Sequence, residues 1–268
     1  MTAGRDHSSM IRHPAKPVVI PAHSSKRPPC PVRYAIFYTP PVTHAITRLA
    51  AAWLGRDAFG GEPQSRPVIS AFSAARLSEL TEAPRRYGFH ATLKAPFHLA
   101  AGVDGSRLVS ALQSFGRARP AFAMPKLKVG RLGPFFALVP AGDAAALNQF
   151  AADIVEGFEA FRAPLTAADY ARRKPEQLSA LHRAYLQQWG YPYVFDAFQF
   201  HMTLTGPVPD ADADRMEEAL TALFKPLLSP PLICDHLTLF CERQTGGPFM
   251  VHTSIPLKSS LSAKAATS

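Results

Sequence analysis

Two segments of the chain share a pattern of residue types that can move protons. GFHATLKAPF covers 88–97 and QFHMTLTGPV covers 199–208, so their histidines lie 111 positions apart. Each segment contains Phe, His, any residue, Thr, Leu, any residue, a small residue, Pro and an apolar residue. Imidazole titrates near pH 6.5, so one histidine can accept a proton while another donates one. The repeat therefore predicts a site that uses both histidines.

Strand geometry decides which neighbours join the histidines, because side chains two apart point to the same face. Two polar faces are expected: His90, Thr92 and Lys94 in the first segment, and His201, Thr203 and Thr205 in the second. The hydroxyls can donate to phosphoryl oxygens, and Lys94 can offset the charge that builds there. Threonine is a poor zinc ligand and the histidine spacing gives no three-ligand set, so we expect no metal and no cofactor. These residues predict metal-free chemistry on a phosphodiester.

Several other residues leave two interpretations open. Tyr38 could stack on a sugar or base or fill the core, and Tyr87 and Tyr193 flank the histidine segments, where they could guard the cleft. His236 repeats the His-x-Thr spacing but lacks the preceding Phe and the following Pro, so it is expected to be structural. Arg85 and Arg86 are interpreted as solvated loop charges. The cluster Arg172, Arg173 and Lys174 is interpreted as a solvated turn, with a phosphate-contacting lid as the alternative.

Strand and helix signals alternate around the histidine segments. Apolar runs predict strands over 33–40, 121–129, 135–140, 231–240 and 249–257. Helical spacing predicts helices over 43–54, 108–116, 147–158, 175–189 and 216–224, the first with Thr43 as N-cap. A long loop is expected between residue 55 and the first histidine segment. Strands that return after single helices in two similar halves predict an α+β fold of two related lobes.

Composition and charge restrict the cellular location of the protein and the kind of substrate it can bind. No run of roughly 18 apolar residues and no secretory layout occur, which predicts a cytoplasmic protein with no membrane partner, and we expect a monomer. Cys30, Cys234 and Cys241 are expected to be reduced thiols. Residues 1–32 and 258–268 are expected to be disordered tails around one domain, 33–257. Most of the net charge of +9 lies on those tails, so a small phosphodiester is expected as substrate and long nucleic acid is not.

The motifs HATL and HMTL resemble the paired H-x-T-x signatures of the 2H phosphoesterase superfamily. RYAIFYTP, RRYGFHATLKAPF, WGYPYVFDAFQFHMTLTGPV and GGPFMV are similar, in that order, to segments of a bacterial branch encoded near phosphonate-utilisation genes. The resemblance covers 33–257. It implies a bilobal fold, with antiparallel sheets facing a central cleft and helices outside, and it implies catalytic roles for His90, Thr92, His201 and Thr203.

The resemblance also implies a reaction. Members of the superfamily hydrolyse or form 2′,3′-cyclic phosphates and related phosphodiesters without metal, and the genomic company of this branch points to a cyclic phosphate of ribose. We therefore expect a hydrolase that opens a nucleoside or ribose cyclic phosphate by paired-histidine acid–base catalysis. The alternatives are a non-catalytic module that binds a nucleotide or an RNA end, and an RNA-end-processing enzyme that uses the same site.

Overall fold

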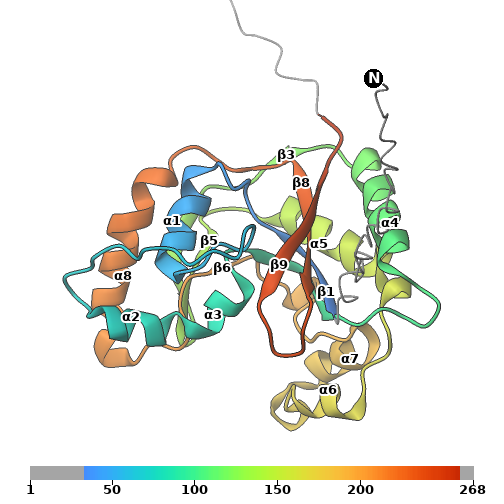
Figure 1. Ribbon diagram of the computed structural model, residues 1–268. Coiled ribbons are helices and arrows are strands. Elements are labelled where there is room, and N and C mark those ends of the chain that lie inside the picture. Colours follow the sequence, from blue (N-terminus) through green and yellow to red (C-terminus); the bar gives the residue numbers. More distant parts are fainter. Residues whose placement is uncertain (1–32, 260–268) are drawn as a thin grey trace, which may run out of the picture.

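An antiparallel sheet at the centre of the molecule carries both histidine segments (Figure 1). The structure is a computed structural model that describes residues 33–259, so the predicted tail at 1–32, most of the predicted tail at 258–268, and Cys30 lie outside the described residues. Seven strands form the sheet in the order β4-β5-β6-β2-β1-β8-β9, and β3 pairs with β7 beside it. The strands span Arg33–Tyr38 (β1), Ala91–Phe97 (β2), Phe122–Ala123 (β3), Leu127–Leu132 (β4), Phe135–Pro140 (β5), Met202–Thr203 (β6), Ile233–Cys234 (β7), His236–Glu242 (β8) and Phe249–Pro256 (β9).

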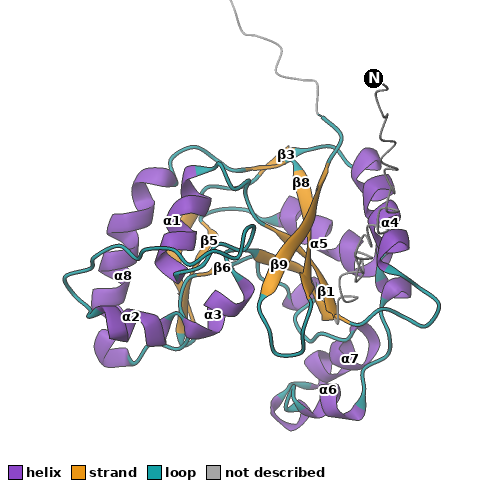
Figure 2. Ribbon diagram, in the orientation of Figure 1, coloured by secondary structure: helices purple, strands orange, loops and turns teal. Residues whose placement is uncertain are grey.

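Helices surround this sheet, and the mixture confirms the predicted α+β class (Figure 2). The α helices span Ala45–Leu54 (α1), Ala74–Leu80 (α2), Glu82–Tyr87 (α3), Gly105–Ala118 (α4), Ala145–Gly157 (α5), Ala167–Ala171 (α6), Ala180–Trp189 (α7) and Asp210–Phe224 (α8). Short 3-10 turns span Glu159–Phe161 (η1), Pro175–Gln177 (η2), Phe195–Ala197 (η3) and Lys225–Leu227 (η4). Among residues 33–259, no helix is both long enough and apolar enough to cross a bilayer.

The structure confirms the predicted antiparallel strands, and seven of them belong to one continuous sheet. Every pairing in the seven-stranded sheet is antiparallel, and β2 and β6, which follow the two histidines, are direct neighbours. One half-sheet, β4-β5-β6, comes from the middle of the chain. The other, β2-β1-β8-β9, combines an early segment with the two closing strands. The halves of the sheet are therefore not the halves of the sequence, because the chain returns at its end to pair β8 with β1.

The two faces of the sheet are buried differently. One face carries the main core, to which β1 contributes Tyr34, Ile36 and Tyr38, and α1, α4, α5 and α8 contribute apolar side chains. On the opposite face Phe37, Phe240 and Phe249 form a smaller cluster with Ala35 and Ala58. Because side chains alternate along a strand, this smaller cluster shares its face with the residues opposite Phe37 on β2. That face is only partly covered, which leaves room for a site.

Local signals explain where the helices begin and end. α1 ends at Gly55, whose φ of 78° is the left-handed C-cap expected of glycine. Its N-cap is His44, whose side chain accepts from Ile46 N–H, and not the predicted Thr43. α4 continues past Gly116 to Ala118, because the missing Cβ lets the helix pack closely on β9. A Cβ at Gly116 would lie 2.5 Å from the carbonyl oxygen of Pro256.

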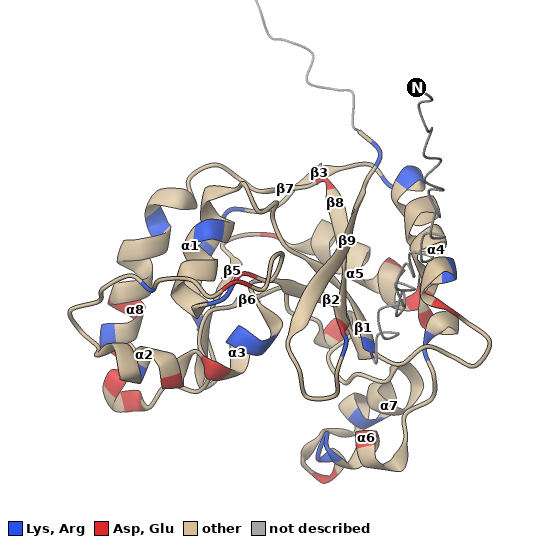
Figure 3. Cartoon of the chain, in the orientation of Figure 1, with Lys and Arg blue, Asp and Glu red and all other residues tan. Residues whose placement is uncertain are grey.

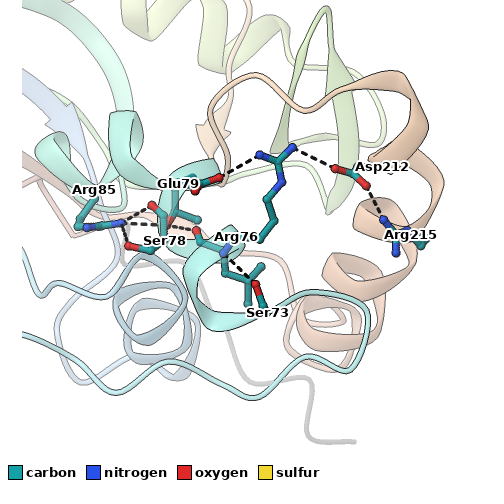
Figure 4. Close-up of polar contacts among 9 residues, drawn as sticks. Ser73, Arg76, Ser78, Glu79, Arg85, Asp212 and Arg215 are labelled. Carbon is teal, nitrogen blue, oxygen red and sulfur yellow. Dashed lines mark hydrogen bonds and ion pairs between the residues drawn. The ribbon is translucent and has the colours of Figure 1, made fainter.

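The predicted loop before the first histidine contains two helices, α2 and α3. Ser73 caps α2, and Arg76 joins α2 to α8 through Asp212, at 3.1 Å (Figure 4). Arg85 is not the solvated charge that was predicted, because it donates to the carbonyls of Leu54 and Ser78. These bonds fix α3, and α3 leads directly to His90.

The end of the described chain and the buried thiols complete the fold. Lys258 lies beyond the predicted domain boundary at residue 257, yet its backbone N–H donates to the carbonyl of Gly116 and its carbonyl accepts from Ala121 N–H. The ordered part therefore extends past that boundary.

Cys234 and Cys241 are buried free thiols, as predicted. Burial raises the pKa of both thiols, which keeps them protonated and unreactive.

Candidate functional site

The two H-x-T segments meet side by side at the centre of the sheet. Ala91 of β2 is paired with Met202 of β6 in antiparallel register. The same register places His90 opposite Thr203 and Thr92 opposite His201. Each histidine therefore faces the threonine of the other copy, and all four side chains lie on the sheet face that carries Phe37. We call this set of four the His–Thr quartet.

His90 is held tightly in a mostly apolar setting. Its ring stacks on Phe37 with centroids 3.9 Å apart, and Tyr87 lies at 6.0 Å. Nδ1 is 2.8 Å from the carbonyl of Gly88, and a carbonyl only accepts, so Nδ1 carries the proton. Nε2 is then free to accept, and the Thr92 hydroxyl lies 3.3 Å from it. Burial, with smaller effects from the charges of His201 and Arg56, lowers the pKa of His90 from 6.5 to about 4. His90 is neutral at physiological pH.

Gly88 is essential to this placement. It has a φ of 76°, and an added Cβ would lie 2.5 Å from the Cβ of Ala58. Only glycine fits there without strain, because other residues rarely adopt positive φ and would also meet Ala58. The turn that Gly88 makes after α3 directs its carbonyl to the imidazole of His90.

His201 lies in a more open setting. Its Nδ1 is 2.7 Å from the carbonyl of Gln199, which repeats the arrangement at His90 and leaves Nε2 directed away from the backbone. Its ring is 5.7 Å from that of Phe135. His201 and Thr92 line a cleft of about 570 Å³, whose other walls include Phe135, Tyr191, Tyr193, Phe198 and Gln199. A cleft with aromatic walls and a few polar groups is typical of a small-molecule site.

Lys94 and Thr205 do not join the quartet, which corrects the predicted polar faces. A bulge shifts the β1–β2 register between Thr92 and Lys94, so Lys94 turns under α5. There its Nζ donates to the carbonyl of Val155 and pairs with Glu159 at 2.8 Å. In the second copy Thr205 is fully buried and its hydroxyl accepts from Phe136 N–H at 2.9 Å. In the first copy a bulge interrupts the alternation after the H-x-T triplet although β2 continues to Phe97, and in the second copy the strand ends at Thr203.

The predicted tyrosines separate into two groups. Tyr38 lies opposite Ala91 on the core face, is 1% exposed and donates to the carbonyl of Ile233, so it fills the core. Tyr87 lies beside His90 and stacks on Phe249 at 5.1 Å. Tyr193 is 46% exposed and lines the cleft with His201. The structure thus brings Tyr87 and Tyr193 to the quartet and places Tyr38 elsewhere.

His236 has the surroundings of a structural histidine. It is 8% exposed, its Nδ1 contacts Asp235, and its Nε2 lies 2.7 Å from the carbonyl of Thr39. Both ring nitrogens are therefore occupied, and neither is left for a ligand. This agrees with the prediction from its incomplete motif.

Sequence reasoning missed several residues of the cleft. Phe37 lies in the phase of β1 opposite to Tyr38, and this alternation alone could have placed it on the histidine face. Tyr191, Phe198 and Gln199 come from loops around η3 that have no periodic signal. Phe195, in the same stretch, has a φ of 53° and packs against Trp189. A strained non-glycine residue next to a cleft is a common feature of functional sites.

Comparison with known proteins places the chain in a family. The family model described as "Protein of unknown function (DUF1045)" matches residues 92–250, which include Thr92, His201 and Thr203. The chain belongs to the DUF1045 family. His90 lies two residues before the matched region.

Two curated relatives of this DUF1045 chain carry a name with a function. Both are called "Ribose 1,5-bisphosphate phosphokinase PhnN". The protein from Janthinobacterium sp. (strain Marseille) is 37% identical over 228 residues, which is 84% of this chain and 50% of the relative. The protein from Laribacter hongkongensis (strain HLHK9) is 33% identical over 218 residues, 81% of this chain and 50% of the relative. The chain therefore spans about half the length of the curated relatives it matches.

These names correct the functional prediction. A phosphokinase transfers a phosphoryl group, whereas a cyclic phosphodiesterase is a hydrolase, so the predicted hydrolase acting on a cyclic phosphate is wrong. The predicted alternatives, a nucleotide or RNA-end binding module and an RNA-end-processing enzyme, agree with the name no better. Paired histidines and threonines can serve several kinds of phosphate chemistry, so they do not fix the reaction.

Proposed function

We propose that this DUF1045 chain binds phosphorylated ribose at the His–Thr quartet, and that it supplies this sugar-phosphate site for ribose 1,5-bisphosphate phosphorylation. The observation that carries the proposal is the register of Ala91 with Met202, which gathers two imidazoles and two hydroxyls on one face. The names of the relatives indicate the ligand, a ribose that bears phosphates at positions 1 and 5.

The quartet supplies the groups that such a ligand needs. The hydroxyls of Thr92 and Thr203 donate to phosphate oxygens, since charge-assisted hydrogen bonds are the strong ones. His90 is neutral and its Nε2 accepts, so it suits a ribose hydroxyl better than a phosphate oxygen. The aromatic rings of Tyr191, Tyr193 and Phe198 provide apolar walls for the sugar. The cleft volume of about 570 Å³ leaves room for a bisphosphorylated pentose.

The quartet is proposed to bind the sugar that accepts the phosphoryl group, and not the nucleotide that donates it. The sequence contains no G-x-x-x-x-G-K-[ST] motif, the loop that holds nucleotide phosphates in many kinases. We propose that the His–Thr quartet positions ribose bisphosphate, with the phosphoryl donor bound outside this cleft.

The metabolic context, the cellular location and the oligomeric state are also proposals. The designation PhnN agrees with the predicted link to phosphonate utilisation, and we propose a cytoplasmic, monomeric protein that acts in that context. We also propose that the half-sheets β4-β5-β6 and β2-β1-β8-β9 correspond to the two lobes of the 2H superfamily, a kinship of fold that leaves the reaction open.

Calorimetric titration with ribose 1,5-bisphosphate tests the proposal. We expect the wild-type chain to bind it, and Thr92→Val and Thr203→Val each to weaken binding roughly tenfold, the worth of one good hydrogen bond to a charged group. Thr253→Val on β9 is the matched control, because it removes a strand hydroxyl that lies outside the His–Thr quartet. Absence of wild-type binding, or equal losses in all three variants, would reject the proposal.

A further inference from the structure

A second cavity shares the wall residue Tyr191 with the cleft beside the quartet, and it is lined by cations. Its volume is about 360 Å³, and its walls carry six basic side chains: Arg33, Arg86, Lys94, Arg162, Arg172 and Arg173. The loop between β8 and β9 and the α6–α7 segment enclose it, and Figure 1 shows these elements close together below β1. Figure 3 shows Lys and Arg positions on the α6 segment and at the start of β1. We call this cavity the arginine pocket.

Its carboxylates neutralise only part of this charge. Glu242 is fully buried and is shared by Arg33 and Arg86, each 2.6 Å away. Glu159 is likewise shared by Lys94, at 2.8 Å, and Arg162. Each glutamate therefore leaves one positive charge without a counter-charge. The ion pairs also hold the cations in fixed positions, so the pocket is rigid before any ligand binds.

The α6 segment adds a further positive charge. Arg172 is paired with Asp169. Arg173 lies over the ring of Tyr191, 5.1 Å from its centroid, and has no carboxylate partner within residues 33–259. Six cations thus face three carboxylates around one small cavity. An excess of three positive charges in a partly enclosed space favours an anion with several negative charges.

Tyr191 connects this pocket to the proposed sugar site, because its side chain lines both cavities. Tyr87 is a second link, since it lines the arginine pocket and lies beside His90. The two cavities therefore adjoin at Tyr191.

We infer that the arginine pocket binds one phosphate of a bisphosphorylated sugar while the His–Thr quartet binds the other end of the same molecule. The inference rests on the proposed function for the identity of the sugar. The chemistry of the pocket itself, rigid guanidinium groups with excess positive charge, is that of a phosphate monoester site. The chain thereby distinguishes bisphosphates from monophosphates.

The first experiment addresses the pocket alone, with inorganic phosphate as the probe at constant ionic strength. We expect phosphate to raise the melting temperature of the wild-type chain, and Arg173→Gln to weaken phosphate binding roughly tenfold. Lys174→Gln is the matched control, because it removes the same charge from the next residue, which does not line the pocket. Equal losses in Arg173→Gln and Lys174→Gln would overturn the inference, since they would show a general effect of surface charge.

The second experiment compares ribose 1,5-bisphosphate with ribose 1-phosphate and ribose 5-phosphate by calorimetry. We expect the bisphosphate to bind at least tenfold more tightly than either monophosphate, and Arg173→Gln to remove the advantage over one of them. A bisphosphate that binds the wild type, but is weakened by Arg173→Gln no more than both monophosphates, would overturn this inference and leave the proposed function standing. Failure of all three sugars to bind the wild type would instead reject the proposed function, and with it the sugar as the ligand of this pocket.

Discussion

The two copies of the H-x-T triplet have the same residues and nearly the same backbone contacts but different surroundings. His90 precedes a seven-residue strand in the interior and stacks on Phe37. His201 precedes a two-residue strand and lines an open cleft with Tyr193. The same motif therefore provides one imidazole that is fixed and neutral and one that faces an open cleft. Repetition in sequence therefore does not give the two histidines the same surroundings.

The largest expected difference concerns protonation of His90. Its pKa is 6.5 when unfolded and about 4 when folded, so the unfolded chain binds a proton between these values and the folded chain does not. Stability is unaffected above pH 6.5 and falls as the pH drops toward 4, by about 3 kcal/mol in total. Urea denaturation of wild type and His90→Gln, followed by circular dichroism from pH 7 to pH 4, measures this. An equal loss of stability in both proteins would show that His90 is not the group responsible.

The next largest effect is on ligand affinity, where the two histidines are expected to differ. His201→Ala is expected to weaken ribose 1,5-bisphosphate binding roughly 30-fold, or about 2 kcal/mol, because it removes a polar group that faces the ligand. The unfolding free energy should change by less than about 0.5 kcal/mol, since the ring lies at the edge of an open cleft. His90→Ala should lower both quantities, because the stack on Phe37 is lost. Calorimetric titration and urea denaturation of both variants test this prediction. Similar stability losses for His201→Ala and His90→Ala would show that the two rings contribute equally to folding.

A smaller effect separates two neighbouring threonines in the second copy. Thr205→Val leaves the backbone N–H of Phe136 without its buried acceptor and should cost about 1–2 kcal/mol of unfolding free energy, with ligand affinity within about twofold of wild type. Thr203→Val should do the reverse, with weaker binding and little change in stability. A binding loss in Thr205→Val comparable to that in Thr203→Val would mean that the second copy keeps its polar face beyond the triplet.

The smallest effect on binding is expected at His236, the third His-x-Thr in the chain. His236→Ala removes the hydrogen bond to the carbonyl of Thr39 and should cost about 1 kcal/mol of stability. Ribose 1,5-bisphosphate affinity should stay within about twofold, because neither ring nitrogen is available to a ligand. A tenfold loss of affinity would contradict this prediction, because it would show that His236 also contributes to ligand binding.

Much of the fold could be predicted where periodicity was strong. β1, β5, β8 and β9 were found from aromatic and β-branched runs, and α1, α5 and α8 from helical spacing that ends at caps or prolines. α2, α3 and α6 have only five to seven residues, too few for two turns of amphipathic repeat, so no signal separated them from loops. The return of β8 to β1 is a long-range pairing, and local patterns do not specify it.

The site could be predicted only in its centre. The repeated formula predicts that His90, Thr92, His201 and Thr203 act together, and the structure brings these four onto one face of the sheet. Lys94 and Thr205 depart from strict alternation for different reasons, because a bulge follows Thr92 in the first copy and β6 ends at Thr203 in the second. The residues do not specify the reaction, because imidazoles and hydroxyls serve many kinds of phosphate chemistry.

The shortness of β6 has a mechanical consequence. The only strand pairing between the two half-sheets in the described chain is that of Ala91 with Met202, in the middle of the quartet. A sheet joined by so narrow a seam is expected to open there before it opens anywhere else. A bound molecule that touches residues on both sides would act as a clamp across the seam. Deuterium uptake at the amides of Ala91 and Met202 should therefore slow when the cleft is filled.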